Sequence, residues 1–243
     1  MPPKETLNRW LTDIQTHFKR RNGVEVYLSD PKLTALHYFC MQLDSQALTK
    51  QPVEQTRFVV IDTETTGLQA YSGDEIISIS LLEMQGLKFT GHKYETLIDP
   101  QRPIPPESTA IHGLQDSDVV GCPKITEILA DLIYFIDEAV IIGHHIGFDL
   151  RFLNKTLKKQ LLCELRHPWI DTMLLYTALR GQVGHYTLDE IAAICRIHNP
   201  ARHTAHGDAI ATGLIFQYLV KPLLLRNSRV TDLIEIQFEV GQF

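Results

Sequence analysis

Two carboxylates stand one residue apart at the end of an apolar run. Asp62 and Glu64 open the segment DTETTG (62–67), directly after residues 58–61. Side chains alternate along a strand, so both acids point to the same side, where they repel each other unless a cation lies between them. Mg²⁺ and Mn²⁺ prefer oxygen ligands, and this pair would make half of a site for such an ion. Taken alone, an acidic pair at a strand end is often just solvated.

Two further acids lie far along the chain. Asp149 ends the segment GHHIGFD (143–149), which begins at the end of the apolar run 139–143. It stands where a helix should begin, a position that the helix dipole favours for a carboxylate, although an ordinary helix cap is the alternative. Asp208 lies near the start of a predicted helix in HTAHGDA (203–209), five residues after His203. A neutral imidazole there can take a proton from water, but a capping or surface histidine has the same appearance.

Together the three segments resemble the motifs of the DEDDh exonuclease superfamily, which includes the proofreading subunit of the bacterial replicative polymerase, ribonuclease T and oligoribonuclease. The motif D-x-E-T-T-G stands at 62–67 and H-x-A-x-x-D-A at 203–209. The motif H-N-x-x-F-D is matched at 144–149, with His145 in place of the usual Asn. The sister subclass needs a tyrosine four residues before the last Asp, where this chain has Thr204, so the histidine subclass fits.

The resemblance implies a fold and a chemistry. The fold is ribonuclease-H-like, an α/β architecture with a mixed five-stranded sheet flanked by helices. Two Mg²⁺ or Mn²⁺ ions would lie over the scissile phosphate, and His203 would be the general base; the ions would be held by Asp62, Glu64, Asp149 and Asp208. Nucleoside 5′-monophosphates would leave one at a time from a 3′ end. The expected substrate contacts are Thr65, Gly67, Leu68, His112 and Phe148.

The pattern of apolar residues predicts the elements that position these side chains. Short apolar or β-branched runs predict strands at 58–61, 75–83, 87–98 and 139–143. Apolar residues spaced by three and four predict helices, and these cover 124–137, 149–160, 171–180, 187–195 and 205–219. Strands followed by strand–helix alternation favour a mixed sheet with helices on its faces. Two more helices are expected near the N-terminus, at 6–20 and 31–43.

Length and composition limit the organisation of the chain. The 243 residues suffice for one large domain or a domain with a small extension. We expect a helical N-terminal extension at 1–56, whose polar end (49–56) is a linker, an exonuclease domain at 57–220, and a C-terminal tail at 221–243 that is strand or loop. No apolar run is long enough to cross a bilayer, and no signal peptide is evident. The four cysteines form no C-x-x-C pair, which argues against a zinc site or a disulfide framework and favours the cytoplasm.

The net charge is 23 − 29 = −6, which disfavours a broad, non-specific grip on duplex DNA but not the binding of one strand end. Our leading hypothesis is therefore a metal-dependent 3′→5′ exonuclease acting on single-stranded DNA or frayed ends. The first alternative is RNA 3′-end trimming or oligoribonuclease activity, since the residues that would sense a 2′-OH are not identifiable. The second is a non-catalytic accessory module of a polymerase complex. A polymerase or another protein is the expected partner of the N-terminal helices, and no membrane is expected.

Overall fold

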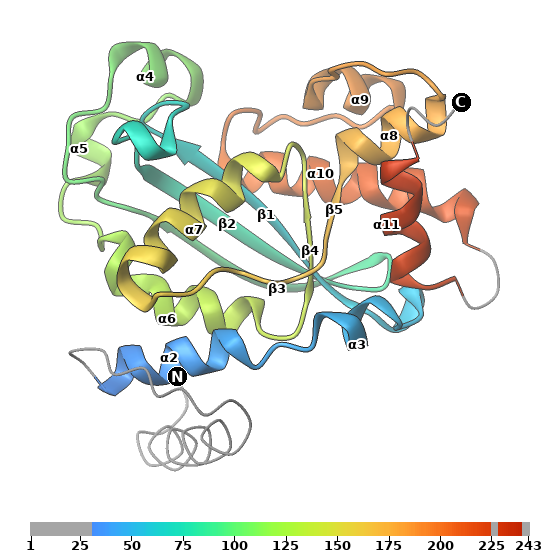
Figure 1. The fold of residues 1–243 in the computed structure, drawn as a ribbon. Helices are drawn as coiled ribbons and strands as arrows, with labels where there is room; N and C mark the ends of the chain where they lie inside the picture. The colour runs from blue at the N-terminus through green and yellow to red at the C-terminus, as the bar shows by residue number, and fades with distance from the viewer. Residues whose placement is uncertain (1–30, 225–227, 240–243) are drawn as a thin grey trace.

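A five-stranded mixed sheet forms the centre of the computed structural model, which describes residues 31–224 and 228–239 (Figure 1). The strand order is β3-β2-β1-β4-β5. The strands are β1 (Arg57–Thr65), β2 (Ile76–Gln85), β3 (Lys88–Leu97), β4 (Val140–Gly143) and β5 (Trp169–Asp171). β1 pairs antiparallel with β2 and parallel with β4, β2 pairs antiparallel with β3, and β4 pairs parallel with β5. The predicted α/β class with a mixed five-stranded sheet is confirmed.

The central strand β1 is buried on both faces at its start, as its unbroken apolar run predicts. Val59 and Ile61 face one core, and Phe58 and Val60 face the other. The strand continues to Thr65, beyond its last pairing with β4 at Val60, because β2 stays paired with it on the other side, with a register shift between Glu64 and Thr65. This projection of β1 past the carboxyl end of β4 leaves the last residues of β1 accessible to helices from both faces.

Helices cover both faces of the sheet (Figure 1). Those on one face are α6 (Ile125–Ile136) and α7 (Gly147–Leu161), which pack on Val59 and Ile61. Those on the other are α8 (Thr172–Arg180), α9 (Leu188–Ile194) and α10 (Ala205–Val220). All five were predicted to within a few residues. The helices α4 (Pro106–His112) and α5 (Asp116–Val119), and the three-residue strand β5, had no predicted counterpart.

The N-terminal extension is helical where the structure describes it. The predicted helix at 31–43 is α2 (Pro31–Met41), and the shorter α3 (Ser45–Thr49) follows. Leu36 and Cys40 of α2 pack on α6 and α7. The expected linker holds a 3-10 turn, Val53–Gln55, whose fully buried Val53 donates its N–H to the carbonyl of Ser228 at 2.9 Å. The predicted helix at 6–20 lies outside the described residues, and the domain boundaries at 56 and 220 stay predictions.

The tail corrects one expectation, because residues 230–238 are a helix rather than strand or loop. This helix, α11 (Val230–Phe238), contacts α8 and β5. Its β-branched residues favour a strand locally, but burial of Val230 and Leu233 against the body of the protein decides for a helix. At its start the N–H of Arg229 donates to the Asp232 carboxylate at 2.7 Å. In the described part of the chain, no helix is both long and apolar enough to span a membrane.

Candidate active site

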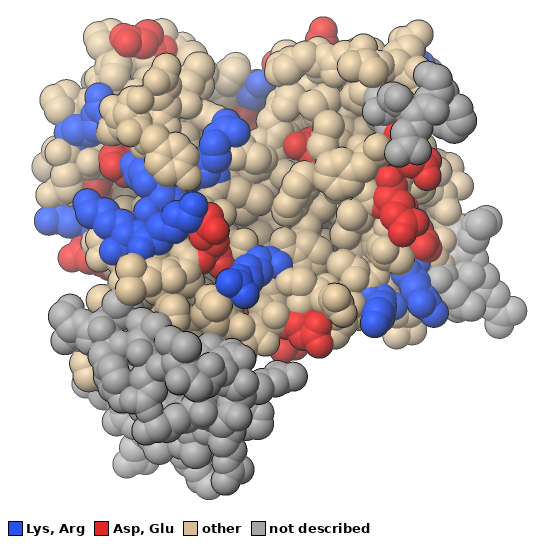
Figure 2. Space-filling view, in the orientation of Figure 1, with Lys and Arg blue, Asp and Glu red and all other residues tan. Residues whose placement is uncertain are grey.

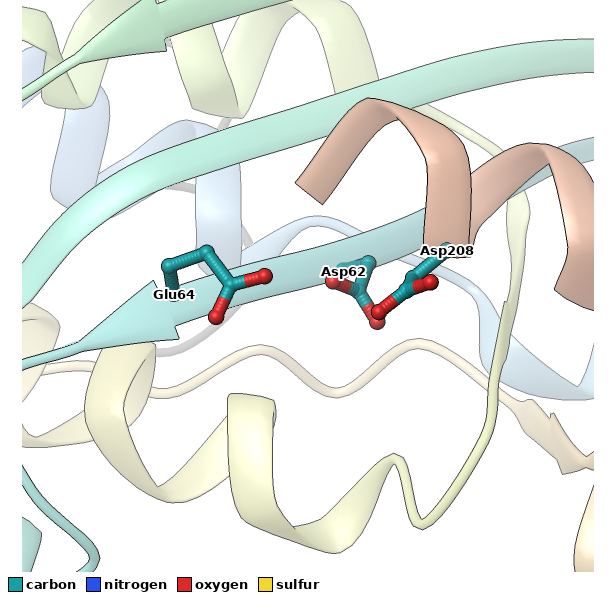
Figure 3. A group of neighbouring side chains, drawn as sticks. All are labelled: Asp62, Glu64 and Asp208. Atoms are coloured by element: carbon teal, nitrogen blue, oxygen red, sulfur yellow. The ribbon is translucent and has the colours of Figure 1, made fainter. Parts of the chain in front are cut away.

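Three of the four predicted acids meet where β1 projects beyond β4. Asp62 and Glu64 lie on the same face of β1, the side that α10 covers, and Asp208 lies in the first turn of α10. One carboxylate oxygen of each acid lies within 4.8 Å of the others. Figure 3 shows the Asp62 and Asp208 carboxylates close together, with Glu64 turned toward them along the strand. Strand alternation thus gives two ligands from one element, and the helix start adds a third.

Asp149 approaches the same end of β1 from the opposite face. It is 4% exposed in the first turn of α7, and its Oδ1 accepts a hydrogen bond from the Thr63 hydroxyl at 2.7 Å. Thr63 alternates with Asp62 and Glu64 and therefore points to the α7 side. Asp149 is consequently outside the group of three acids that lie within 4.8 Å of one another. Its charge nevertheless contributes, after burial, to the raised pKa of Asp62.

The cluster is electrostatically unfavourable without a cation. Burial raises the pKa of Asp62 well above its usual range, and the charges of Asp149, Asp208 and Glu64 raise it further. Burial and Asp208 raise the pKa of Glu64 to about 7. Burial likewise raises the pKa of Asp149 to about 7, against the hydrogen bond from Thr63. Oxygen donors that repel one another in this way fit a hard divalent cation, so these acids are suited to hold Mg²⁺ or Mn²⁺.

These shifts predict how stability depends on pH. Glu64 has a pKa near 4.5 when unperturbed and about 7 in the fold, so the folded protein binds more protons than the unfolded chain between these values. Its contribution to the free energy of unfolding must therefore fall as pH rises through this window. The half-buried His144, whose pKa is lowered to about 3 mainly by loss of solvation, makes the opposite contribution: its part of the free energy of unfolding rises with pH up to about pH 6.5. The measurement is thermal unfolding in EDTA from pH 4 to 8, for wild type and Glu64→Gln.

We expect the glutamine variant to gain stability relative to wild type as pH rises to about 7, and the gain to level off above it. Adding Mg²⁺ should raise the midpoint of wild type more at pH 8 than at pH 5, because the ionised acids bind the cation. A stability difference between the two proteins that does not change with pH would contradict the assigned shift.

His203 lies at the rim of the acidic cluster. Its N–H donates to Asp208 Oδ2 at 3.3 Å, and its backbone is left-handed, with φ 62°. A hydrogen bond from Thr204 Oγ1 to the Ala201 carbonyl, at 2.7 Å, closes the turn that carries His203. A Cβ at Gly207 would overlap that same carbonyl, so only glycine lets α10 pack this closely under the turn. The charge of His203 also adds to burial in lowering the pKa of His112.

The expected substrate contacts are of two kinds. Thr65 and Gly67 shape the loop after β1: the Thr65 hydroxyl donates to the Gly67 carbonyl at 2.6 Å, and a Cβ at Gly67 would overlap the Asp74 carboxylate. Leu68 is open to a ligand, whereas the Nε2 atom of His112 is buried. Leu68 is 78% exposed, and His112 accepts the Leu114 N–H on Nδ1 while its Nε2 has no partner among the described residues.

Phe148 is half-buried and less open than the pattern suggested. Its ring packs on Phe152, with centroids 4.9 Å apart, and the Arg151 guanidinium lies 5.9 Å from the ring centroid. One flank of the ring therefore belongs to the α7 side of the core. What remains for a nucleotide is its solvent-facing part.

The two histidines before Asp149 make hydrogen bonds that fix the loop into α7. His144 pairs through Nδ1 with the Thr172 hydroxyl at 3.0 Å and through Nε2 with the Tyr186 carbonyl at 3.1 Å. His145 is left-handed, with φ 54°, and its ring stacks on His185 with centroids 4.4 Å apart. Asn and His tolerate this conformation better than most residues, which explains why His can replace the usual Asn.

Asp171 holds that loop in place. Its carboxylate accepts the N–H groups of His145 and Ile146, each at 3.1 Å, and that of Met173 at 2.9 Å. Its own N–H donates to the side chain of Gln237 in α11 at 2.9 Å. The tail is thus connected to the segment that presents Asp149.

Sequence reasoning missed three residues that contact the acids. Thr63 binds Asp149, and Asn199 Nδ2 donates to Asp208 Oδ1 at 2.7 Å. Arg202 Nη1 donates to Asp208 Oδ2, and Arg202 Nε donates to Asp189 Oδ1 at 2.7 Å. Thr63 and Arg202 adjoin motif residues, which is the one signal that marks them. Asn199 carries no signal at all, because only the turn before α10 brings it back to Asp208.

Comparisons with known proteins identify the family of the chain. The RNase_T family, described as exonuclease, matches residues 59–216. The chain is 38% identical over 186 residues to a DNA polymerase III subunit epsilon-like protein of Rhodobacter capsulatus, covering 74% of this chain but 26% of that protein. It is 30% identical over 166 residues to the DNA polymerase III subunit epsilon of Aquifex aeolicus, covering 68% of this chain and 81% of that one.

A solved structure shares the fold. Exonuclease X in complex with 5′ overhanging duplex DNA superposes with a TM-score of 0.56 at 24% identity, over 72% of this chain and 98% of that chain. The ribonuclease-H-like architecture expected from the motifs is confirmed, and so is the superfamily. The chain therefore belongs to the RNase_T exonuclease family, within the DEDDh superfamily that its three motifs predict.

Proposed function

We propose that the chain is a metal-dependent 3′→5′ exonuclease that releases nucleoside 5′-monophosphates from single-stranded DNA or frayed 3′ ends. One observation carries the proposal: acids from β1 and α10 place their oxygens within 4.8 Å of one another, with His203 bonded to the edge of the same cluster. Exonucleases of this family depend on divalent metal ions, and the donor set fits such ions.

The side chains would have separate roles in phosphodiester hydrolysis. Two divalent ions, Mg²⁺ or Mn²⁺, would stabilise charge on the attacking and the leaving oxygen. Asp62, Glu64, Asp149 and Asp208 would hold them, with Asp149 oriented by the Thr63 hydroxyl. His203 would take the proton from the attacking water, and the hydrogen bond from its backbone N–H to Asp208 places residue 203 next to the acids. Leu68, exposed just after β1, would wedge against the terminal base.

The surface beside the site favours binding of a single strand end over extended, non-specific binding of duplex DNA. Figure 2 shows Lys and Arg side chains gathered on the side of the molecule where α7 lies in Figure 1. Two lysines of α7 are already paired, since Lys155 lies 2.6 Å from Glu75 and Lys158 lies 2.6 Å from Glu164. Paired surface charges contribute little to phosphate binding, so contacts to the terminal nucleotide should carry the affinity.

A polymerase is the proposed partner, because the relatives above are named as DNA polymerase III epsilon subunits or epsilon-like proteins. The cytoplasm, which the cysteine spacing predicts, is the proposed location. The N-terminal extension is the proposed docking segment. Its helix α2 buries apolar residues against α6 and α7, so the docking surface would have to lie elsewhere on the extension.

The test is a strand-trimming assay with the purified chain. Single-stranded DNA and RNA of one sequence, labelled at the 5′ end, are incubated with Mg²⁺, Mn²⁺ or EDTA. We expect a ladder shortened from the 3′ end, 5′-monophosphates as products, DNA cleaved faster than RNA, and no cleavage in EDTA. Faster cleavage of RNA would assign the chain to RNA trimming or oligoribonuclease activity. The absence of product from every strand would instead assign it to a non-catalytic accessory role.

A further inference from the structure

Arg202 joins the acidic cluster to a second acid outside it. Its Nη1 donates to Oδ2 of the buried Asp208, and its Nε donates at 2.7 Å to Oδ1 of Asp189 in α9. The two partners differ in environment, because the side chain of Asp189 is 61% exposed and that of Asp208 is 6% exposed. One guanidinium thus bridges an acid of the site and an acid at the surface.

The charge of Arg202 acts on the whole cluster. Burial raises the pKa of Asp62, Glu64 and Asp208, and the guanidinium opposes that rise at all three acids. Arg202 is therefore a countercharge for the acids in the protein without metal. A divalent cation held by the same carboxylates would lie close to this guanidinium, and two positive charges drawn to one carboxylate repel each other.

We propose that Arg202 is a positioning residue that holds Asp208 and competes with the divalent cation for its carboxylate, while Asp189 draws the guanidinium away. This inference rests on the metal site of the proposed function. Asn199 keeps Asp208 oriented when Arg202 loosens its hold, because it binds the other oxygen, Oδ1, at 2.7 Å. Asp189 determines how strongly Arg202 binds Asp208, because its own negative charge offsets part of the guanidinium charge.

The test is the affinity for Mn²⁺ alone, measured by titration calorimetry without nucleic acid. Arg202→Gln should bind Mn²⁺ more tightly than wild type, by about tenfold, because a competing charge is gone. The Asp189→Asn variant should bind Mn²⁺ several-fold more weakly than wild type, because the Arg202 guanidinium then pairs more strongly with Asp208. The double variant should match Arg202→Gln, since Asp189 acts through Arg202. A purely structural role would instead weaken Mn²⁺ binding in both single variants.

Two further variants keep the result interpretable. Arg202→Lys retains the charge and should bind Mn²⁺ nearly as wild type does. It replaces the glutamine variant in the test if that variant does not fold. Arg180→Gln removes an equal charge from an exposed site on α8 and should leave the affinity unchanged. Weaker binding by Arg202→Gln, or additive effects in the double variant, would overturn the inference while leaving the exonuclease proposal intact. A wild-type chain that binds no Mn²⁺ would overturn both.

Discussion

Replacing Asp62 with asparagine should lower the rate of 3′ trimming by about 10³-fold or more and leave the metal-free protein at least as stable as wild type. The two effects have one cause. Burial and three neighbouring acids raise the pKa of Asp62, so its ionised form opposes folding. In the proposed function the same charge would hold the cation, and a neutral amide would hold it much less tightly.

The measurement pairs single-turnover trimming of labelled DNA in Mg²⁺ with thermal unfolding in EDTA at pH 8. Asp131→Asn is the matched control, because it removes an exposed carboxylate from α6 outside the acidic cluster. That control should keep full activity. Trimming at the wild-type rate by purified Asp62→Asn would rule out this site, whatever the stability result.

Replacing His203 with alanine should slow trimming by about 10²- to 10⁴-fold, the usual contribution of a general base, without weakening Mn²⁺ binding. The hydrogen bond from residue 203 to Asp208 comes from the backbone, so it survives the change of side chain. Loss of the imidazole should also remove the part of the pH–rate profile in which activity rises as the base loses its proton.

His206→Ala is the matched control for that variant. His206 lies in the first turn of α10, and its Nδ1 faces the Glu95 carboxylate of β3 rather than one of the four predicted acids. It should change neither the rate nor the shape of the profile. An unchanged pH–rate profile in His203→Ala would refute the assignment of the base even if the rate fell.

The chain's residue patterns predicted the elements that are long and periodic. The unbroken apolar run at 58–61 indicated a strand buried on both faces, and alternation placed Asp62 and Glu64 on one side of it, as observed. The spacing of apolar residues alone could not show that α10 packs against β1. That convergence came from the resemblance between the three motifs and a known family, because the order of motifs reflects a shared fold rather than a local preference.

What was missed depends on tertiary contacts. Asn199 and Arg202 reach Asp208 only because the turn at 201–204 folds back under the start of α10. The strand β5 has three residues, too few for any pattern, and is held by parallel pairing with β4. In α11, β-branched residues favour a strand locally, but packing on α8 and β5 decides for a helix.

The hydrogen bond between Gln237 and Asp171 bears on how this chain should be shortened or fused. The family match ends at residue 216, so a truncation chosen from that match alone would discard α11. It would strip the Asp171 amide of its acceptor and uncover β5, next to the carboxylate that orders the turn into α7. Engineered versions should keep the chain through residue 239, and affinity tags are better attached beyond it.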